Sequence, residues 1–155
     1  MDPIRFRQLL GSFATGVAVV TARDRGGAPT GMTASAIASV SLEPPLLLVC
    51  VWEDADFHAV IAAAEHFCLN ILAEGQGDVS RRFATDTGDR FATLAWQPHA
   101  TGVPVLADTA AHIVCARHAA HTAGDHTIFV GRVIDGRATD RPPLLHVRGA
   151  YRRLR

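Results

Sequence analysis

The residues best suited to hold a ligand lie in Gly31–Pro45, a stretch in which most side chains are small or carry hydroxyl groups. Thr33, Ser35 and Ser41 supply hydroxyls, and the alanines between them leave the backbone open to close approach. A flat ligand rich in heteroatoms needs such a surface, because backbone N–H and C=O groups can then serve as donors and acceptors. The same composition also occurs in strands of ordinary β domains, and both interpretations stay open here.

His126 is the second candidate, because it follows Gly124 and Asp125 in a segment typical of a turn. Its imidazole can reach a ligand there, although most such histidines only contact water, and Asp125 is expected to cap the turn. The neighbouring His118 and His121 do not predict a metal site, since three-residue spacing on a strand directs the two rings to opposite faces. No Cys-x-x-Cys pair accompanies them, and no G-x-S-x-G motif predicts a hydrolase.

Three carboxylates, Glu53, Asp54 and Asp56, stand at the start of a predicted helix. We expect Asp54 or Asp56 to be the N-cap, because its side chain can accept hydrogen bonds from the free N–H groups of the first turn. The same N–H groups would otherwise attract an anion such as a phosphate. The sequence therefore predicts a helix start at which a bound phosphate would meet competing negative charge.

The elements that must position these residues are read from hydrophobic periodicity, caps and turn residues. Asp2 and Pro3 predict the start of an N-terminal helix whose apolar residues extend to Phe13 and which ends at Gly16. Two further helices are predicted, at Phe57–Glu65 and Asp78–Thr85. Strands are predicted at Val17–Ala22, Gly31–Ser35, Ile37–Leu42, Leu46–Trp52, Phe67–Leu72, Leu94–Gln97, Ala110–Ala119, Thr127–Arg137, Leu144–Val147 and Ala150–Leu154.

This succession of short strands with few helices predicts a mainly β fold, a closed antiparallel barrel rather than a doubly wound sheet. The apolar run Leu46–Trp52 is expected to be a strand buried on both faces. No G-x-G-x-x-G motif follows a strand, which argues against a Rossmann nucleotide site. The chain has 155 residues, enough for one domain, residues 1–155, with a single core.

Composition and charge argue against several classes of protein. Fifteen basic and fifteen acidic residues balance, so neither nucleic acid nor an anionic membrane is an expected partner. No apolar run approaches the roughly 20 residues that span a bilayer, and the N-terminus lacks the pattern of a signal peptide. Cys50, Cys68 and Cys115 lie in apolar segments, which indicates buried, reduced thiols and a cytoplasmic location.

Five segments, in order along nearly the whole chain, resemble the flavin reductase-like family, the short-chain NAD(P)H:flavin reductases that supply two-component monooxygenases. They are FATGVAVVTA (Phe13–Ala22), GMTASAIASVSLEPPLLLVCV (Gly31–Val51), FCLNIL (Phe67–Leu72), GDHTIFVGRV (Gly124–Val133) and YRRL (Tyr151–Leu154). The resemblance implies a six-stranded antiparallel split β-barrel, the FMN-binding split barrel, with a few short flanking helices. It also implies a homodimer with flavin near the subunit interface, FMN or FAD as the flavin, and NAD(P)H as co-substrate.

The resemblance also implies roles for individual residues. Hydride transfer from a nicotinamide to a flavin requires little acid–base chemistry from the protein, which must mainly hold the two ring systems. His126 would be the catalytic-site histidine, near the nicotinamide. Cys50 would pass beside the flavin, although an ordinary buried apolar thiol is the favoured interpretation of this residue. The residues expected to bind the flavin are Met32, Thr33, Ala34, Ser35, Val40, Ser41, Cys50, Val51, Asp56, Arg82 and Phe83.

The acidic run at Glu53–Asp56 departs from the family pattern, since relatives usually place hydroxyl-bearing and often basic residues there to hold the flavin phosphate. Either Arg81 and Arg82 would supply the positive charge, or flavin would bind weakly and with little dependence on its phosphate. The expected activity is NAD(P)H-dependent reduction of free FMN or FAD, with the reduced flavin passing to a partner monooxygenase. The alternative is a non-catalytic flavin- or haem-binding module with the same barrel.

Overall fold

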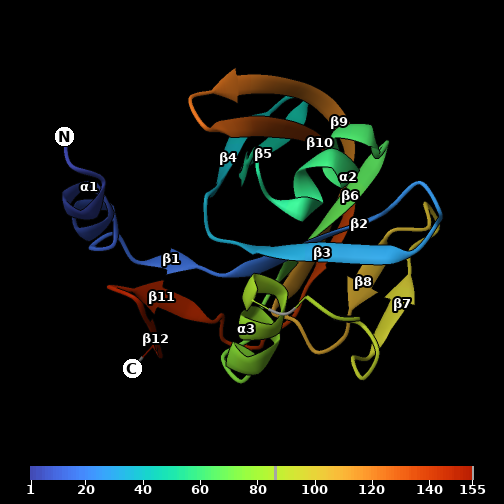
Figure 1. Cartoon of the computed structure of the whole chain (residues 1–155). Coiled ribbons are helices and arrows are strands. Elements are labelled where there is room, and N and C mark those ends of the chain that lie inside the picture. Colours follow the sequence, from blue (N-terminus) through green and yellow to red (C-terminus); the bar gives the residue numbers. More distant parts are fainter. Residues whose placement is uncertain (86, 155) are drawn as a thin grey trace.

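The centre of the molecule is one curved antiparallel sheet, seen in a computed structural model that describes residues 1–85 and 87–154 (Figure 1). Seven strands follow the order β3-β2-β6-β9-β10-β5-β4, and every neighbouring pair is antiparallel. Within the described residues the two edge strands, β3 and β4, do not pair with each other, so the barrel is split. The strands are β2 (Ala18–Arg23), β3 (Pro29–Ala34), β4 (Ile37–Leu42), β5 (Pro45–Trp52), β6 (His66–Ile71), β9 (Ala111–Ala123) and β10 (His126–Ala138).

The predicted mainly β split-barrel architecture is confirmed, with differences in detail. The main sheet of the described residues has seven strands, whereas the family resemblance implies six; β3 and β4, predicted as separate strands, lie at its opposite edges. Strand β8 was missed, since its short segment between two turns carries little periodicity. Five shorter strands lie outside the main sheet: β1 (Thr15–Gly16), β7 (Trp96–Pro98), β8 (Pro104–Leu106), β11 (Leu145–Val147) and β12 (Ala150–Arg152).

Strand β5 is buried on one face only, which corrects the expectation that both of its faces are buried. Leu47, Val49 and Val51 are buried, whereas the residues between them are half-buried and Trp52 is 49% exposed. Successive side chains of a strand point to opposite faces. One face of β5 therefore packs on the barrel core, and the other remains available to a ligand or a partner.

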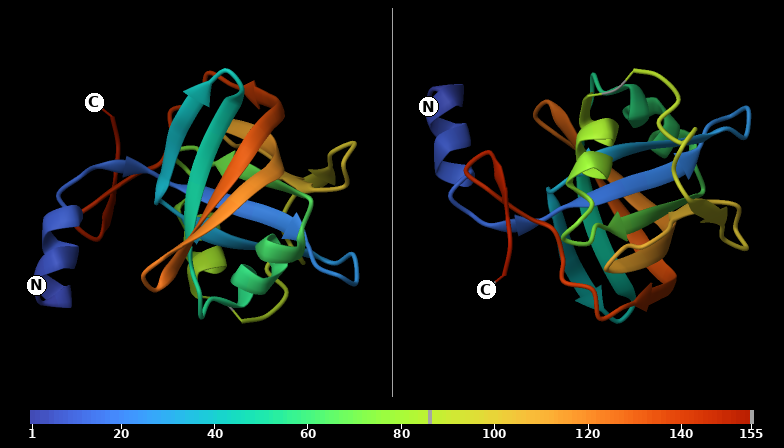
Figure 2. Two further views of the ribbon diagram at one scale, coloured as in Figure 1. Left: turned by 90° about the horizontal axis from the view of Figure 1, so that it is seen from above. Right: turned by 90° about the horizontal axis from the view of Figure 1, so that it is seen from below.

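In the part of the chain that the structure describes, three helices accompany the sheet: α1 (Pro3–Leu10), α2 (Asp56–Ala63) and α3 (Gly77–Thr85). Asp2 caps α1 as predicted, but the helix ends at Gly11 rather than Gly16, where the Gly11 N–H donates to the Arg7 carbonyl. No residue of α1 is buried, and α1 projects from the barrel together with β1 and the β11–β12 hairpin (Figure 2). Within the described chain, no helix is long and apolar enough to cross a membrane.

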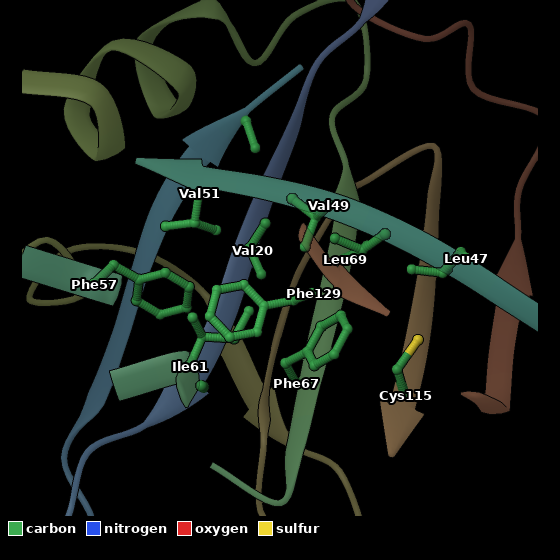
Figure 3. Packing of buried hydrophobic residues seen from close by; sticks show 12 residues of the cluster. Val20, Leu47, Val49, Val51, Phe57, Ile61, Phe67, Leu69, Cys115 and Phe129 are labelled. Atoms are coloured by element: carbon green, nitrogen blue, oxygen red, sulfur yellow. The ribbon is translucent and has the colours of Figure 1, made fainter. Parts of the chain in front are cut away.

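Helix α2 closes one end of the barrel with its apolar face. Phe57 and Ile61, one turn apart on α2, point into the core (Figure 3). There they join a cluster that includes Val20, Val51 and Phe129 from three strands of the sheet. Burial of these large side chains fixes the start of α2 beside the end of β5.

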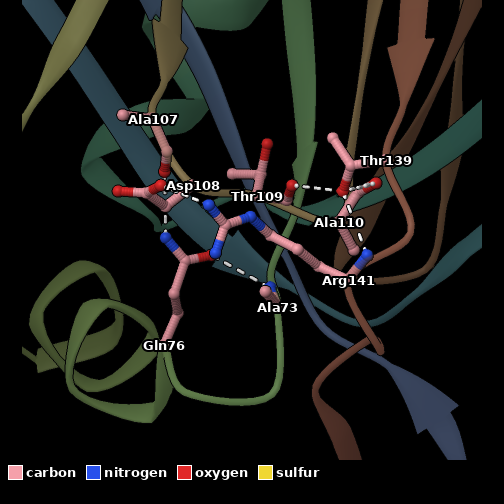
Figure 4. Close-up of polar contacts among 8 residues, drawn as sticks. All are labelled: Ala73, Gln76, Ala107, Asp108, Thr109, Ala110, Thr139 and Arg141. Atoms are coloured by element: carbon pink, nitrogen blue, oxygen red, sulfur yellow. Dashed lines mark hydrogen bonds and ion pairs between the residues drawn. The ribbon is translucent and has the colours of Figure 1, made fainter.

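Helix α3 is fixed at its N-terminal end by polar contacts with distant loops (Figure 4). The side-chain oxygen of Gln76 accepts a hydrogen bond from the Ala73 N–H at 2.9 Å, and its nitrogen donates to the Ala107 carbonyl at 3.0 Å. Nearby, Arg141 forms an ion pair with Asp108 at 2.7 Å. These contacts hold Gln76, the residue before α3, against the loop after β8. Helix α3 is thereby placed so that it contacts β3.

Candidate functional site

A cavity of about 510 Å³ opens where the corner between β3 and β4 meets the end of β5, the start of α2 and the end of α3. This volume is in the range of roughly 300–1,000 Å³ that is typical of small-molecule sites. Most of the residues that the sequence nominated for a site line this cavity: Met32, Thr33, Ala34, Ser35, Cys50, Asp56, Phe83 and His126.

Four of the nominated residues do not line the cavity. Val51 is fully buried in the barrel core, on the opposite face of β5 from Cys50. Val40 and Ser41 lie further along β4, where the ladder with β5 is irregular between residues 39 and 41. Arg82 is half-buried on α3, and its guanidinium donates to the Thr93 hydroxyl at 3.0 Å.

The wall formed by β3 depends on close approach between its backbone and α3. A Cβ atom at Gly31 would lie 2.8 Å from the Val20 carbonyl oxygen and 3.1 Å from the Phe83 ring, so only glycine fits there. Two residues further on, the Thr33 hydroxyl donates to the Ser80 carbonyl of α3 at 2.7 Å. The small residues of this stretch therefore let α3 pack against β3 and leave a hollow beyond their contact.

The start of α2 differs from the sequence expectation. Ala55 is the N-cap, no side chain caps the helix, and Asp56 is the first helical residue. The reason is a turn at residues 52–55, closed by the bond from the Ala55 N–H to the Trp52 carbonyl. This turn makes Ala55 the N-cap, so the helix begins at Asp56, one residue before the predicted start at Phe57. Asp54 and Asp56 instead line the cavity, so this wall is acidic.

His126 stands at the cavity edge, at the first position of β10 and opposite Trp52 at the end of β5. The Nδ1 atom of its ring lies 2.7 Å from the Asp125 carboxylate. This hydrogen bond lowers the pKa of Asp125, so the carboxylate stays ionised. Asp125 therefore orients the imidazole, a role that the sequence analysis had not given it, and Nε2 is the ring nitrogen left to meet a ligand.

Arg90 also lines the cavity, and sequence analysis missed it. Its guanidinium donates to the Gly31 carbonyl of β3 at 2.9 Å. The only local signal is its place immediately before Phe91, a buried aromatic residue. That signal shows that the segment is anchored to the core, but it does not reveal which wall the preceding arginine would meet.

Cys50 is half-buried at the cavity wall. Burial raises the pKa of its thiol, so the sulfur is protonated and weakly nucleophilic at neutral pH. The other two cysteines are buried in the core, as expected, and burial raises the pKa of Cys68 and of Cys115 to about 12. Cys50 is thus the thiol that a cavity ligand would contact.

Iodoacetamide should therefore alkylate Cys50 in the folded protein and leave Cys68 and Cys115 unmodified. Because only the thiolate reacts, the rate should rise roughly tenfold per pH unit and keep rising past the ordinary thiol pKa. Peptide mass spectrometry after timed labelling measures this. Equal labelling of all three cysteines, or a rate that levels off near neutral pH, would contradict the assignment.

The residues that line this cavity suit a ligand that is itself the reactive group. The cavity combines a wall of small residues, a protonated thiol, one histidine paired with a carboxylate, and one arginine. No cluster of three or more histidine, cysteine or acidic residues that could hold a metal ion was found in residues 1–85 and 87–154. A planar cofactor with polar edges fits such a site, because the protein need only bind and orient it.

Comparisons with known proteins place the chain in a family. The model of the flavin reductase like domain matches residues 10–155. The chain is 45% identical to the stachydrine N-demethylase reductase subunit of Rhizobium meliloti (strain 1021) over 97% of its own length. It spans only 65% of that relative's length. It is also 45% identical to an FMN reductase (NADH) of Agrobacterium fabrum, with 96% of this chain and 84% of the relative covered.

Among solved structures, the NADH:FAD oxidoreductase of Streptomyces globisporus C-1027, in complex with NAD and FAD fragments, has a TM-score of 0.95. It is 40% identical to this chain, and the match covers 99% of this chain and 93% of that one. Sequence, fold and cavity therefore lead to the same conclusion: the chain belongs to the flavin reductase-like family.

Proposed function

We propose that the chain is an NADH-dependent flavin reductase that reduces FMN or FAD and supplies the product to a separate monooxygenase. The observation that carries this proposal is the cavity itself, in which the small-residue corner of β3 and β4 faces His126 and Cys50. The printed names of relatives, an FMN reductase (NADH) and a demethylase reductase subunit, support the co-substrate and the partner. The bound flavin would accept a hydride at N5 from the reduced nicotinamide.

The residues of the chain would act by binding and orienting. The corner from Met32 to Ser35 offers backbone groups and the Ser35 hydroxyl to the polar edge of a ring system. Asp125 holds the imidazole of His126 at the cavity edge, where Nε2 can bond to the carboxamide of a nicotinamide. Trp52, half exposed beside His126, shields that end of the cavity from water.

The first test is NADH oxidation by the purified protein, with and without added FMN, FAD or riboflavin. We expect flavin-dependent oxidation, because the cavity has the lining that a flavin requires and NADH supplies the electrons. NADPH serves as the comparison co-substrate. Tight binding of flavin without oxidation of either nucleotide would contradict the enzyme and leave the non-catalytic flavin-binding module.

The variant His126→Ala tests the role of the histidine. Loss of one hydrogen bond to the nicotinamide should raise the KM for NADH about threefold to tenfold, because such bonds contribute roughly 0.5–1.5 kcal/mol. The dissociation constant for FMN, measured by fluorescence quenching, should stay unchanged. As a matched control, Asp125→Asn keeps an acceptor for Nδ1 and should have a smaller effect. An unchanged KM in His126→Ala would contradict the assignment.

We also propose that two copies of the chain associate as a homodimer, in keeping with the family. Helix α1 and the segment after it expose large apolar side chains that touch no core. On β4, Leu42 is 96% exposed. A surface this apolar is characteristic of an interface. The exposed apolar residues of the N-terminal arm are Ile4, Phe6, Leu9, Leu10 and Phe13.

Light scattering after size exclusion should therefore give twice the 16.5 kDa mass of the chain. The double variant Phe6→Ser, Leu10→Ser should lower that mass, because it removes apolar area from the arm and leaves the barrel core intact. Gln8→Ser, on the same exposed helix, serves as the control. A wild-type protein that stays monomeric at high concentration would contradict the proposal.

A further inference from the structure

Ser80, in the middle of α3, is a buried residue whose hydroxyl and carbonyl both bond to other elements. Only 1% of the residue is exposed. Its hydroxyl accepts a hydrogen bond from the Tyr151 hydroxyl of β12 at 2.8 Å. Its backbone carbonyl accepts another from the Thr33 hydroxyl of β3 at 2.7 Å. These two bonds link α3, at a single residue, to the C-terminal hairpin and to the barrel.

The Tyr151 ring is held in place by contacts that do not involve its hydroxyl. The Arg81 guanidinium of α3 lies over the ring, 5.5 Å from its centre. The His146 ring of β11 meets it edge-on at 5.8 Å. Tyr151 also packs against the buried cluster that contains Phe83. Phenylalanine at this position would keep these contacts and lose only the hydrogen bond to Ser80.

The two elements that meet at the Ser80 carbonyl, β3 and α3, each form part of the cavity wall. Thr33 lines the cavity on β3, and Phe83 and Ala84, one turn after Ser80, line it on α3. Tyr151 does not line the cavity. A displacement of α3 at Ser80 therefore moves Phe83 and Ala84 relative to Thr33, because closely packed elements transmit such shifts.

We propose that Tyr151 is a positioning residue for flavin binding. Its hydroxyl, acting through Ser80, sets how closely α3 lies against β3 and so fixes the width of the cavity between Thr33 and Phe83. A binding site for a rigid ring system needs walls held within about 0.5 Å of the productive geometry. This inference rests on the proposed function, since the ligand whose binding Tyr151 affects is the flavin.

The test measures the dissociation constants of FMN and riboflavin, by quenching of flavin fluorescence, in the wild type and in Tyr151→Phe. Loss of one neutral hydrogen bond should weaken the binding of both flavins about 2- to 10-fold. The two should weaken alike, because riboflavin has the ring system of FMN and lacks only the phosphate. In turnover the KM for FMN should rise by the same factor, while kcat at saturating FMN stays nearly unchanged.

A double variant separates positioning from a general loss of stability. In Ser80→Ala or Tyr151→Phe alone, one hydroxyl loses its partner, which should lower the thermal midpoint of unfolding. When both substitutions are combined, the midpoint should recover in part, since removing both partners of a hydrogen bond can be nearly neutral. Flavin affinity should stay weakened in all three, because each lacks the bond that fixes α3. If affinity instead recovers with the midpoint, Tyr151 has only a structural role and the proposal is wrong.

Thr139→Val is the matched control, because it removes a hydroxyl that joins distant segments away from the cavity. The Thr139 hydroxyl donates to the carbonyls of Thr109 and Ala110 at 3.2 and 3.1 Å, and Thr139 does not line the cavity. Its loss should lower the thermal midpoint and leave both dissociation constants unchanged. If Thr139→Val weakens flavin binding as much as Tyr151→Phe does, the effect is not specific to α3 and the proposal fails.

The outcomes also separate this inference from the proposed function. Flavin binding that is equally tight in the wild type and in Tyr151→Phe overturns the role of Tyr151 and leaves the reductase intact. Flavin binding that weakens in Tyr151→Phe, in a protein that oxidises neither NADH nor NADPH, supports the role of Tyr151 and overturns the reductase. Absence of binding of either flavin to the wild type overturns both.

Discussion

The site depends on one close contact, the approach of α3 and the following loop to the backbone of β3 at Gly31. A side chain at this position would collide with the Val20 carbonyl and the Phe83 ring. The Gly31 carbonyl also accepts a hydrogen bond from the Arg90 guanidinium. Without this contact, the Phe83 ring could not line the cavity. The Arg90 guanidinium would also lose the carbonyl that holds it at the cavity wall.

The residues that line the cavity carry charges of both signs. Asp54 and Asp56 line it at the start of α2, and Arg90 lines it beside Gly31 of β3. At the far end of β5, Asp125 stays ionised and holds the ring of His126. In the proposed function the protein supplies orientation and the ligands supply the redox chemistry, which fits a cavity whose thiol, Cys50, stays protonated.

Local patterns predicted most of the fold but less of the site. The β-branched strands, the cap at Asp2 and the hairpin at Arg148 were predictable because each rests on neighbouring residues. Strand alternation alone could have shown that Cys50 and Val51 cannot both face one cavity. The position of Arg90 could not be predicted in this way, because it follows from a contact with β3, which is distant in the sequence. The start of α2 depends on a local turn at residues 52–55 in which no side chain caps the helix, so a search for a capping residue placed it wrongly.

A crystal structure of the protein with FMN would test the central claim most directly, that the cavity between β3, α2 and α3 is the flavin site. The account predicts the ring system against the corner from Met32 to Ser35. FMN bound elsewhere, for example in the apolar hollow lined by Phe13 and Ile37, would contradict it.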